Sequence, residues 1–242
     1  MTRAFNFILI SIILTLSPKI VLSKSINSVI IYAVDVSGSY RNVYHKKLKM
    51  EQRVEKNAFK FLNKLVGALE TDISFKAIAI TDLSSLGDVL CETRISRKSF
   101  FNPTKKLQGI NKKQFYQNFL PKQCSAKIKS APTSKATDIS GTIDLGVNLA
   151  RSETDGEILM VLLSDFFEYK PNQMPKFNFD LKGIKFVLIY RNILDTKNPQ
   201  WTLTQEEAKK WKKTLQKAGA KEVVIVDERS SQYAEKVMQE LY

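Results

Sequence analysis

Five short apolar runs, rich in β-branched residues, recur along the chain, and polar residues follow them. They lie at residues 28–36, 73–81, 157–163, 184–190 and 222–226. A continuous apolar run of this length is typical of a strand buried on both faces of a parallel sheet. A less regular run at 89–95 predicts a short antiparallel strand at an edge of the same sheet.

Apolar residues at helical spacing separate these strands. We expect helices over about 43–69, 139–150 and 204–218 and from about 232, with a short helical piece near 112–120. The helix at 204–218 begins with the capping-box sequence Thr204-Gln-Glu-Glu207 and is followed by Gly219, a common C-terminal cap. This alternation predicts one doubly wound, mostly parallel α/β domain whose central sheet is flanked by helices.

Oxygen-bearing side chains follow two of the predicted strands. Asp35, Ser37 and Ser39 lie in the run Asp-Val-Ser-Gly-Ser after strand 28–36, and Asp165 ends strand 157–163. Between them, Thr137 precedes the helix at 139–150, a position that also suits a helix cap. The carboxyl ends of parallel strands share one edge of a sheet, where α/β proteins bind ligands. Polar loops of this kind also serve simply as turns.

The arrangement resembles the von Willebrand factor A domain and its metal-ion-dependent adhesion site. That site has Asp-x-Ser-x-Ser, a distant threonine and an aspartate ending a later strand, and the resemblance covers roughly residues 28–242. It implies a divalent cation bound directly by Ser37, Ser39 and Thr137, with Asp35 and Asp165 binding directly or through water. Oxygen ligands favour Mg²⁺ or Mn²⁺ ahead of Ca²⁺ here, and one coordination position stays open for a partner's Asp or Glu carboxylate. The family often has glycine after the last aspartate, whereas this chain has Phe166-Phe167, so we expect a different rim.

Two enzyme classes are not supported. A serine hydrolase needs an oriented base, but the single histidine, His45, lies eight positions after Ser37, and the chain lacks a Gly-x-Ser-x-Gly elbow. A haloacid dehalogenase-type phosphotransferase needs a second carboxylate where this chain has Ser37. No glycine-rich nucleotide loop is present either. We therefore predict a binding module and not an enzyme.

Residues 1–23 predict a secretory signal peptide, with Arg3, an apolar run of about ten residues and small residues suited to cleavage. An uncleaved anchor is the alternative, and no other stretch is long enough for a transmembrane helix. The domain then occupies residues 24–242, in the periplasm or secreted. In such an oxidising compartment Cys91 and Cys124 can pair, so we predict a disulfide around a predicted insertion at 91–134.

The chain is basic, with 38 Lys and Arg against 24 Asp and Glu and a net charge of +14. Six basic residues form a stripe on the predicted first helix, namely Lys46, Lys49, Arg53, Lys56, Lys60 and Lys64. Most such stripes are a solvated face.

The leading hypothesis is an exported module that captures a protein partner through the cation. The alternative is a basic envelope-associated structural protein that binds an anionic polymer or surface, with the ion only structural. The compartment and the absence of a basic-aromatic platform argue against nucleic acid.

Overall fold

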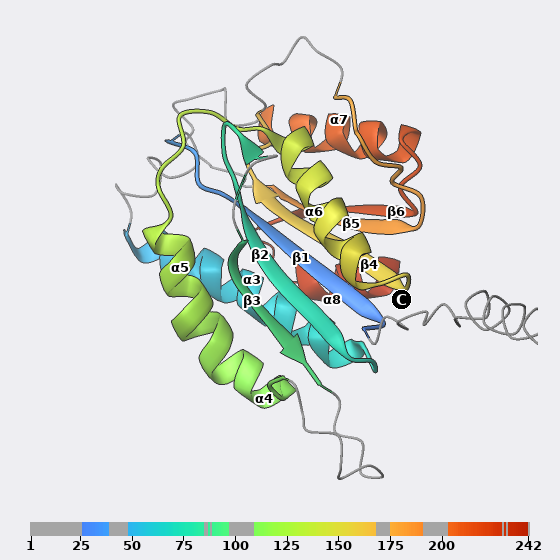
Figure 1. The fold of residues 1–242 in the computed structure, drawn as a ribbon. Coiled ribbons are helices and arrows are strands. Elements are labelled where there is room, and N and C mark those ends of the chain that lie inside the picture. Colours follow the sequence, from blue (N-terminus) through green and yellow to red (C-terminus); the bar gives the residue numbers. More distant parts are fainter. Residues whose placement is uncertain are drawn as a thin grey trace, which may run out of the picture.

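A six-stranded sheet forms the centre of the molecule (Figure 1). The structure, a computed structural model, describes residues 26–38, 48–84, 87, 89–96, 109–167, 175–190, 203–228, 230 and 232–241, with only the backbone for 48–56, 203 and 233. The strands are β1 (Ser28–Asp35), β2 (Ile73–Ile80), β3 (Val89–Ile95), β4 (Glu157–Ser164), β5 (Ile184–Tyr190) and β6 (Glu222–Asp227). Their order across the sheet is β3-β2-β1-β4-β5-β6. All neighbours are parallel except β3, which is an antiparallel edge strand beside β2. The predicted fold class is confirmed.

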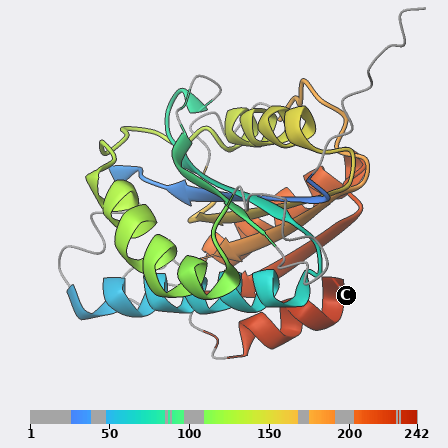
Figure 2. The ribbon, with the colours of Figure 1, turned by 60° about the horizontal axis from the view of Figure 1, so that its bottom comes forward.

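Helices cover both faces of the sheet (Figure 2). They are α3 (Leu48–Ala68), α4 (Lys112–Gln114), the π-helix η2 (Phe115–Cys124), α5 (Ser125–Ser130), α6 (Ile139–Glu153), α7 (Leu203–Lys217) and α8 (Tyr233–Leu241). Because α4, η2 and α5 follow one another without a break, we call them together helix 112–130. None of the described helices is both long and apolar enough to cross a bilayer. The predicted signal peptide at 1–23 lies outside the described residues.

Two apolar cores lie on opposite faces of the sheet because successive side chains of a strand point to opposite sides. On β1, Ile30 and Tyr32 face α3, helix 112–130 and α8, whereas Val29 and Ile31 face α6 and α7. All eight residues of β1 and of β2 are buried. This explains why the central strands read as continuous apolar runs without alternation.

Helix 112–130 is longer than the piece predicted near 112–120. Pro121 lies inside η2 and has no N–H, so it cannot continue an α-helical ladder. The helix continues in the wider π geometry, in which the Ser125 N–H donates to the Leu120 carbonyl. Its apolar side is buried, with Phe115 and Phe119 packed edge-on against Phe75 of β2 at ring-centroid distances of 5.1 and 6.1 Å. Tertiary packing thus maintains a helix that the local sequence would end.

The disulfide between Cys91 and Cys124 is present, as predicted. It joins edge strand β3 to the end of η2, with the two Cα atoms 5.4 Å apart and 33 positions apart in sequence. The predicted insertion at 91–134 therefore begins within the sheet and continues in helix 112–130, although its status as an insertion stays a prediction.

A charged cluster lies where the sheet meets the end of α6. The Lys76 ammonium on β2 is largely buried, donates 2.8 Å to Glu153 Oε1 of α6 and also pairs with Glu92 of β3. Burial alone would lower the pKa of Lys76, but hydrogen bonds and attraction from Glu153 and Glu92 outweigh it and raise that pKa. Burial would likewise raise the pKa of Glu153, but bonds from Lys76 and Ser74 and the charges of Lys76 and Arg94 lower it. Both groups are therefore stabilised in their charged forms.

Candidate functional site

Asp35 ends β1 with its carboxylate buried at the carboxyl edge of the sheet. Its Oδ1 accepts a hydrogen bond from the Ser37 backbone N–H (2.8 Å), and its Oδ2 accepts one from the Ser164 hydroxyl (2.6 Å). The register of β1 and β4 pairs Val34 with Leu163, so Asp35 and Ser164 are cross-strand neighbours. These two bonds fix the orientation of the carboxylate, and a carboxylate has lone pairs left for further partners.

Ser134 joins the loop after β1 to the loop that carries Thr137. The Ser134 N–H donates to the Val36 carbonyl (3.1 Å), and the Gly38 N–H donates to the Ser134 carbonyl (2.9 Å). Ser37 is the bridged partner of Ser134 and is buried. Two loops about a hundred residues apart in sequence are thus held side by side through backbone bonds.

The second end of the threonine loop is bonded to β2. The Asp138 N–H donates to the carbonyl of Thr81, the residue after that strand, at 2.7 Å. Asp138 is also the N-cap of α6, because its Oδ1 accepts from the Gly141 N–H (2.8 Å). The buried Thr137 therefore does not supply the cap, which removes the structural explanation considered for this residue.

Asp165 follows β4 directly and is buried, with its Oδ1 accepting from the Phe167 N–H at 3.1 Å. The next residue, Phe166, has φ of 63°, a left-handed conformation that glycine adopts more easily. This is the position at which the resembled family often has glycine. The Phe166 ring is fully buried in the core beneath α6 and α7, which offsets the conformational cost. Phe167 is exposed beside it, so an aromatic side chain does stand at the rim.

Hydrogen bonds connect this loop to α7. The Phe166 N–H donates to the Ser164 hydroxyl oxygen (3.0 Å), and the indole Nε1 of buried Trp211 donates to the Phe166 carbonyl (3.3 Å). Since Ser164 in turn donates to Asp35, a continuous chain of bonds runs from α7 to the end of β1. Sequence reasoning missed Ser134, Ser164 and Trp211. The position of Ser164, directly before Asp165 at the end of a strand, was the one available signal.

Four of the five predicted ligands thus lie at the carboxyl edge of the sheet, one at the end of β1 and three in the loops there, namely Asp35, Ser37, Thr137 and Asp165, with exposed fractions of 1%, 1%, 3% and 6%. The fifth, Ser39, lies outside the described residues. Within the described part of the chain, no three His, Cys, Asp or Glu side chains are grouped as a metal site. A cation here would therefore need the hydroxyl oxygens as well as the two carboxylates. That donor set fits a hard cation such as Mg²⁺.

The basic stripe is described only in part. Lys46 lies outside the described residues, and the side chains of Lys49, Arg53 and Lys56 on α3 are not described. Lys60 is exposed, and Lys64 pairs with Glu235 of α8. His45, the candidate base of the unsupported hydrolase, also lies outside the described part.

No protein-family model and no curated protein sequence matches this chain. Among solved structures, a variant of the PilB minor pilin from Streptococcus sanguinis is similar with a TM-score of 0.51 and 11% identity, over 90% of this chain and 61% of the pilin chain. A von Willebrand factor type A structure from Catenulispora acidiphila gives 0.48 and 12%, over 88% and 41% of the two chains. Proximal thread matrix protein 1 from the mussel byssus, with a zinc-occupied MIDAS motif, gives 0.46 and 10%, over 89% and 46%.

The chain spans about two thirds or less of each of these proteins. At such identities the pilin likeness concerns the fold alone. The protein therefore has a doubly wound α/β fold similar to that of this pilin.

Proposed function

We propose that this chain is an exported, non-enzymatic binding module that captures a protein partner through a divalent cation at the carboxyl edge of the sheet. The ligands would be Asp35, Ser37, Ser39, Thr137 and Asp165. A bound Mg²⁺ or Mn²⁺ would supply a positive charge with one coordination position open to a partner's Asp or Glu carboxylate. The chain's own residues would bind the cation and orient it toward the partner, with no proton transfer or covalent step. Export places the module in the periplasm or the medium.

The observation that carries the proposal is the burial of two carboxylates at the ends of neighbouring strands, beside a buried threonine that does not cap its helix. Carboxylate and hydroxyl oxygens are the ligands that hard divalent cations prefer. Backbone bonds also fix the loops, because Ser134 bonds the loop after β1 and Asp138 bonds the end of β2. Such preorganisation lowers the entropic cost of binding a cation.

Direct cation titration tests the site. The chain from Lys24, which retains every described element, would be titrated calorimetrically with MgCl₂, MnCl₂ and CaCl₂. Asp35→Asn removes the charge of a ligand, whereas Asp155→Asn removes an exposed carboxylate before β4, at the opposite edge of the sheet. We expect Asp35→Asn to weaken Mg²⁺ binding at least tenfold and Asp155→Asn to leave it unchanged. Equal affinities in all three proteins would refute the site.

Partner capture needs its own measurement. The same three proteins would be used to pull down partners from the native cell envelope, in Mg²⁺ and in chelator. A partner retained only in Mg²⁺, and lost with Asp35→Asn, supports capture through the cation. Retention that survives chelator but falls steeply with salt would contradict it and would instead favour binding of an anionic component by the basic stripe.

A further inference from the structure

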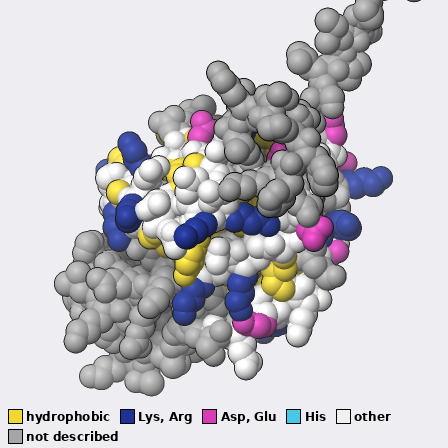
Figure 3. All heavy atoms as spheres, turned by 90° about the horizontal axis from the view of Figure 1, so that it is seen from below, with side chains coloured by type: hydrophobic (Ala, Val, Ile, Leu, Met, Phe, Trp, Pro, Cys, Tyr) yellow, Lys and Arg dark blue, Asp and Glu magenta, His cyan; other side chains and the backbone are white. Residues whose placement is uncertain are grey.

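A long part of this basic chain contains no acidic residue. Residues 93–137 carry eleven Lys and Arg and no Asp or Glu. Helix 112–130 lies within this segment and contributes five of these basic residues, namely Lys112, Lys113, Lys122, Lys127 and Lys129. Figure 3 views the molecule from below Figure 1, the side on which helix 112–130 lies with α3 and α8, and lysine and arginine side chains are spread across its described part.

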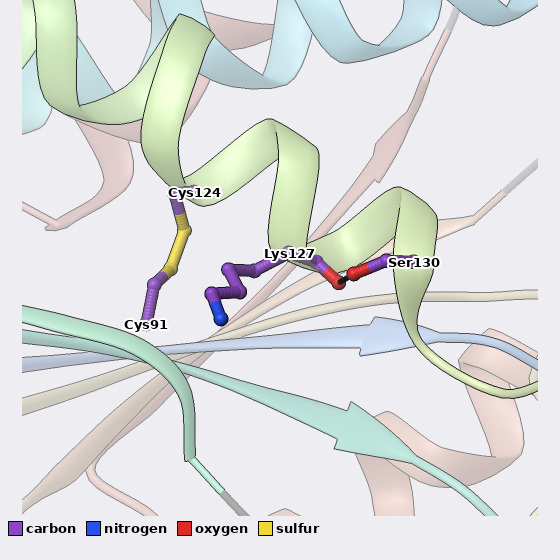
Figure 4. Close-up of a disulfide and its surroundings, with 4 residues drawn as sticks. All are labelled: Cys91, Cys124, Lys127 and Ser130. Carbon is purple, nitrogen blue, oxygen red and sulfur yellow. Dashed lines mark hydrogen bonds between the residues drawn. A yellow bond between two sulfur atoms is a disulfide. The ribbon is translucent and has the colours of Figure 1, made fainter.

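The helix is fixed with its lysines toward solvent. Phe115, Phe119, Leu120 and Cys124 are buried against β2, β3 and α3, and the disulfide holds the middle of the helix to the edge strand (Figure 4). Lys112 has a structural role, because its ammonium donates to the Gly67 and Leu69 carbonyls at the end of α3. The side chains of Lys113, Lys122, Lys127 and Lys129 are exposed, and Lys127 extends beside the disulfide.

Helix 112–130 contains no acidic residue, unlike the exposed helices α7 and α8. On α7, Lys209 and Lys210 pair with Glu206 and Glu207 one turn earlier, and on α8 Lys236 pairs with Glu240. Such pairs neutralise a solvated face locally. On helix 112–130, by contrast, Lys113, Lys122 and Lys127 form no ion pair with any described residue. No carboxylate of the helix itself therefore offsets its positive charge.

We infer that helix 112–130 is a docking surface for an anionic lipid membrane. Its four exposed lysines are spread over on the order of 25 Å, too far apart to surround one compact anion. The helix contains no arginine, and lysine attracts anions as a point charge without the planar fork that selects single phosphates. Tyr116 is 43% exposed among these lysines, and an exposed tyrosine suits the boundary between headgroups and acyl chains. A flat, diffuse anionic layer fits these features best.

Vesicle co-sedimentation tests this inference independently of the metal site, with chelator present throughout. The chain from Lys24 would be mixed with phosphatidylcholine vesicles containing 30% or no phosphatidylglycerol. One variant carries Gln at positions 113, 122, 127 and 129. The matched control carries Gln at positions 209, 210, 213 and 217, four exposed lysines of α7, so both variants lose the same charge.

We expect the original chain and the α7 control to bind the anionic vesicles at low salt and to release them at high salt. The helix 112–130 variant should bind at least tenfold more weakly, and no protein should bind neutral vesicles. An equal loss of vesicle binding in both variants would mean that only the net charge of the protein matters, and it would overturn the inference. Tyr116→Ser separates a membrane from a soluble polyanion, because it should weaken vesicle binding and leave binding of linear polyphosphate unchanged. Equal losses on both probes, or tighter binding of polyphosphate than of vesicles, would contradict the assignment to lipid.

Discussion

The Ser164 hydroxyl is a single group on which both the site and its support depend. It donates to Asp35 Oδ2 at 2.6 Å and accepts from the Phe166 N–H at 3.0 Å, and Ser164 is completely buried. Ser164→Ala removes both bonds and leaves the backbone and almost all of the side-chain volume in place. The variant therefore tests whether this hydroxyl orients the carboxylate of Asp35.

The expected cost follows from the two lost bonds. A hydrogen bond to a charged group contributes about 1.5–3 kcal/mol, and a buried N–H left without a partner costs about 1–3 kcal/mol. The Asp35 carboxylate keeps its bond from the Ser37 N–H, so the two costs do not add in full. We expect the free energy of unfolding to fall by about 3 kcal/mol. With a urea m-value of about 3 kcal/mol/M, the unfolding midpoint should fall by about 1 M.

Urea unfolding followed by circular dichroism, first in chelator and then across a series of MgCl₂ concentrations, gives both stability and cation affinity. Ser152→Ala is the matched control, because this exposed hydroxyl donates only to the Leu149 carbonyl within α6. If Asp35 is a ligand, loss of its orienting partner should weaken Mg²⁺ binding by about tenfold or more. A Ser164→Ala protein as stable as the control would refute the energetic reasoning. A destabilised protein with unchanged Mg²⁺ affinity would refute the orienting role.

Three further predictions test the fold around the site. Glu153→Gln should lower the free energy of unfolding by about 1 kcal/mol at pH 7, a value that allows for the partial exposure of the ion pair. Because the pKa of Glu153 is lowered in the fold, its contribution is present above the ordinary value of 4.5 and is lost as pH falls through the folded value, so the difference from the original chain should shrink toward pH 3. Because the pKa of Lys76 is raised in the fold, the stabilisation by this ion pair is lost on the alkaline side only as pH rises above 10.5, the ordinary pKa of lysine. If urea unfolding gives the same difference in stability between the two proteins at every pH, the ion pair does not stabilise the fold. Replacing Cys91 and Cys124 by Ala opens a link across 33 positions and should cost about 3.7 kcal/mol on the chain-entropy relation, measured by urea unfolding. An unchanged urea midpoint would contradict the predicted stabilisation by the disulfide. Trp211→Phe removes the indole donor to the loop after β4 and should lower both stability, by about 1–3 kcal/mol, and Mg²⁺ affinity. Calorimetry showing unchanged affinity would leave the link to α7 without support.

Strand positions and their burial could be predicted because they depend on local periodicity. The run at 157–163 differs from β4 by one residue, and the predicted strand at 184–190 matches β5 in full. Both strands are buried on two faces, so their sequences had to be apolar at nearly every position. The same reasoning put Asp35 and Asp165 at one edge of the sheet, since parallel strands share their carboxyl ends.

The groups that hold the candidate site together could not be predicted in this way. Ser164 contacts Asp35 only because β4 lies beside β1, and strand order depends on packing between segments more than a hundred residues apart. Ser134 is a loop serine like many others until backbone bonds to Val36 and Gly38 give it a role. Phe166 would be expected to avoid a left-handed conformation, and only burial of its ring in the core beneath α6 and α7 explains why it is found there.

Helix 112–130 separates the two kinds of information most clearly. The sequence by itself determined its apolar spacing, its lysines and the cysteine available for pairing. Local rules end the helix at Pro121, because proline has no N–H for the α-helical ladder. The tertiary structure decided that it continues past Pro121 as the π-helix η2 and then to Ser130 as α5, since Phe115 and Phe119 pack on Phe75 and the disulfide fixes its middle to β3. Contacts between distant segments can outweigh a local preference that is worth only a few kcal/mol, and no reading of neighbouring residues can include them.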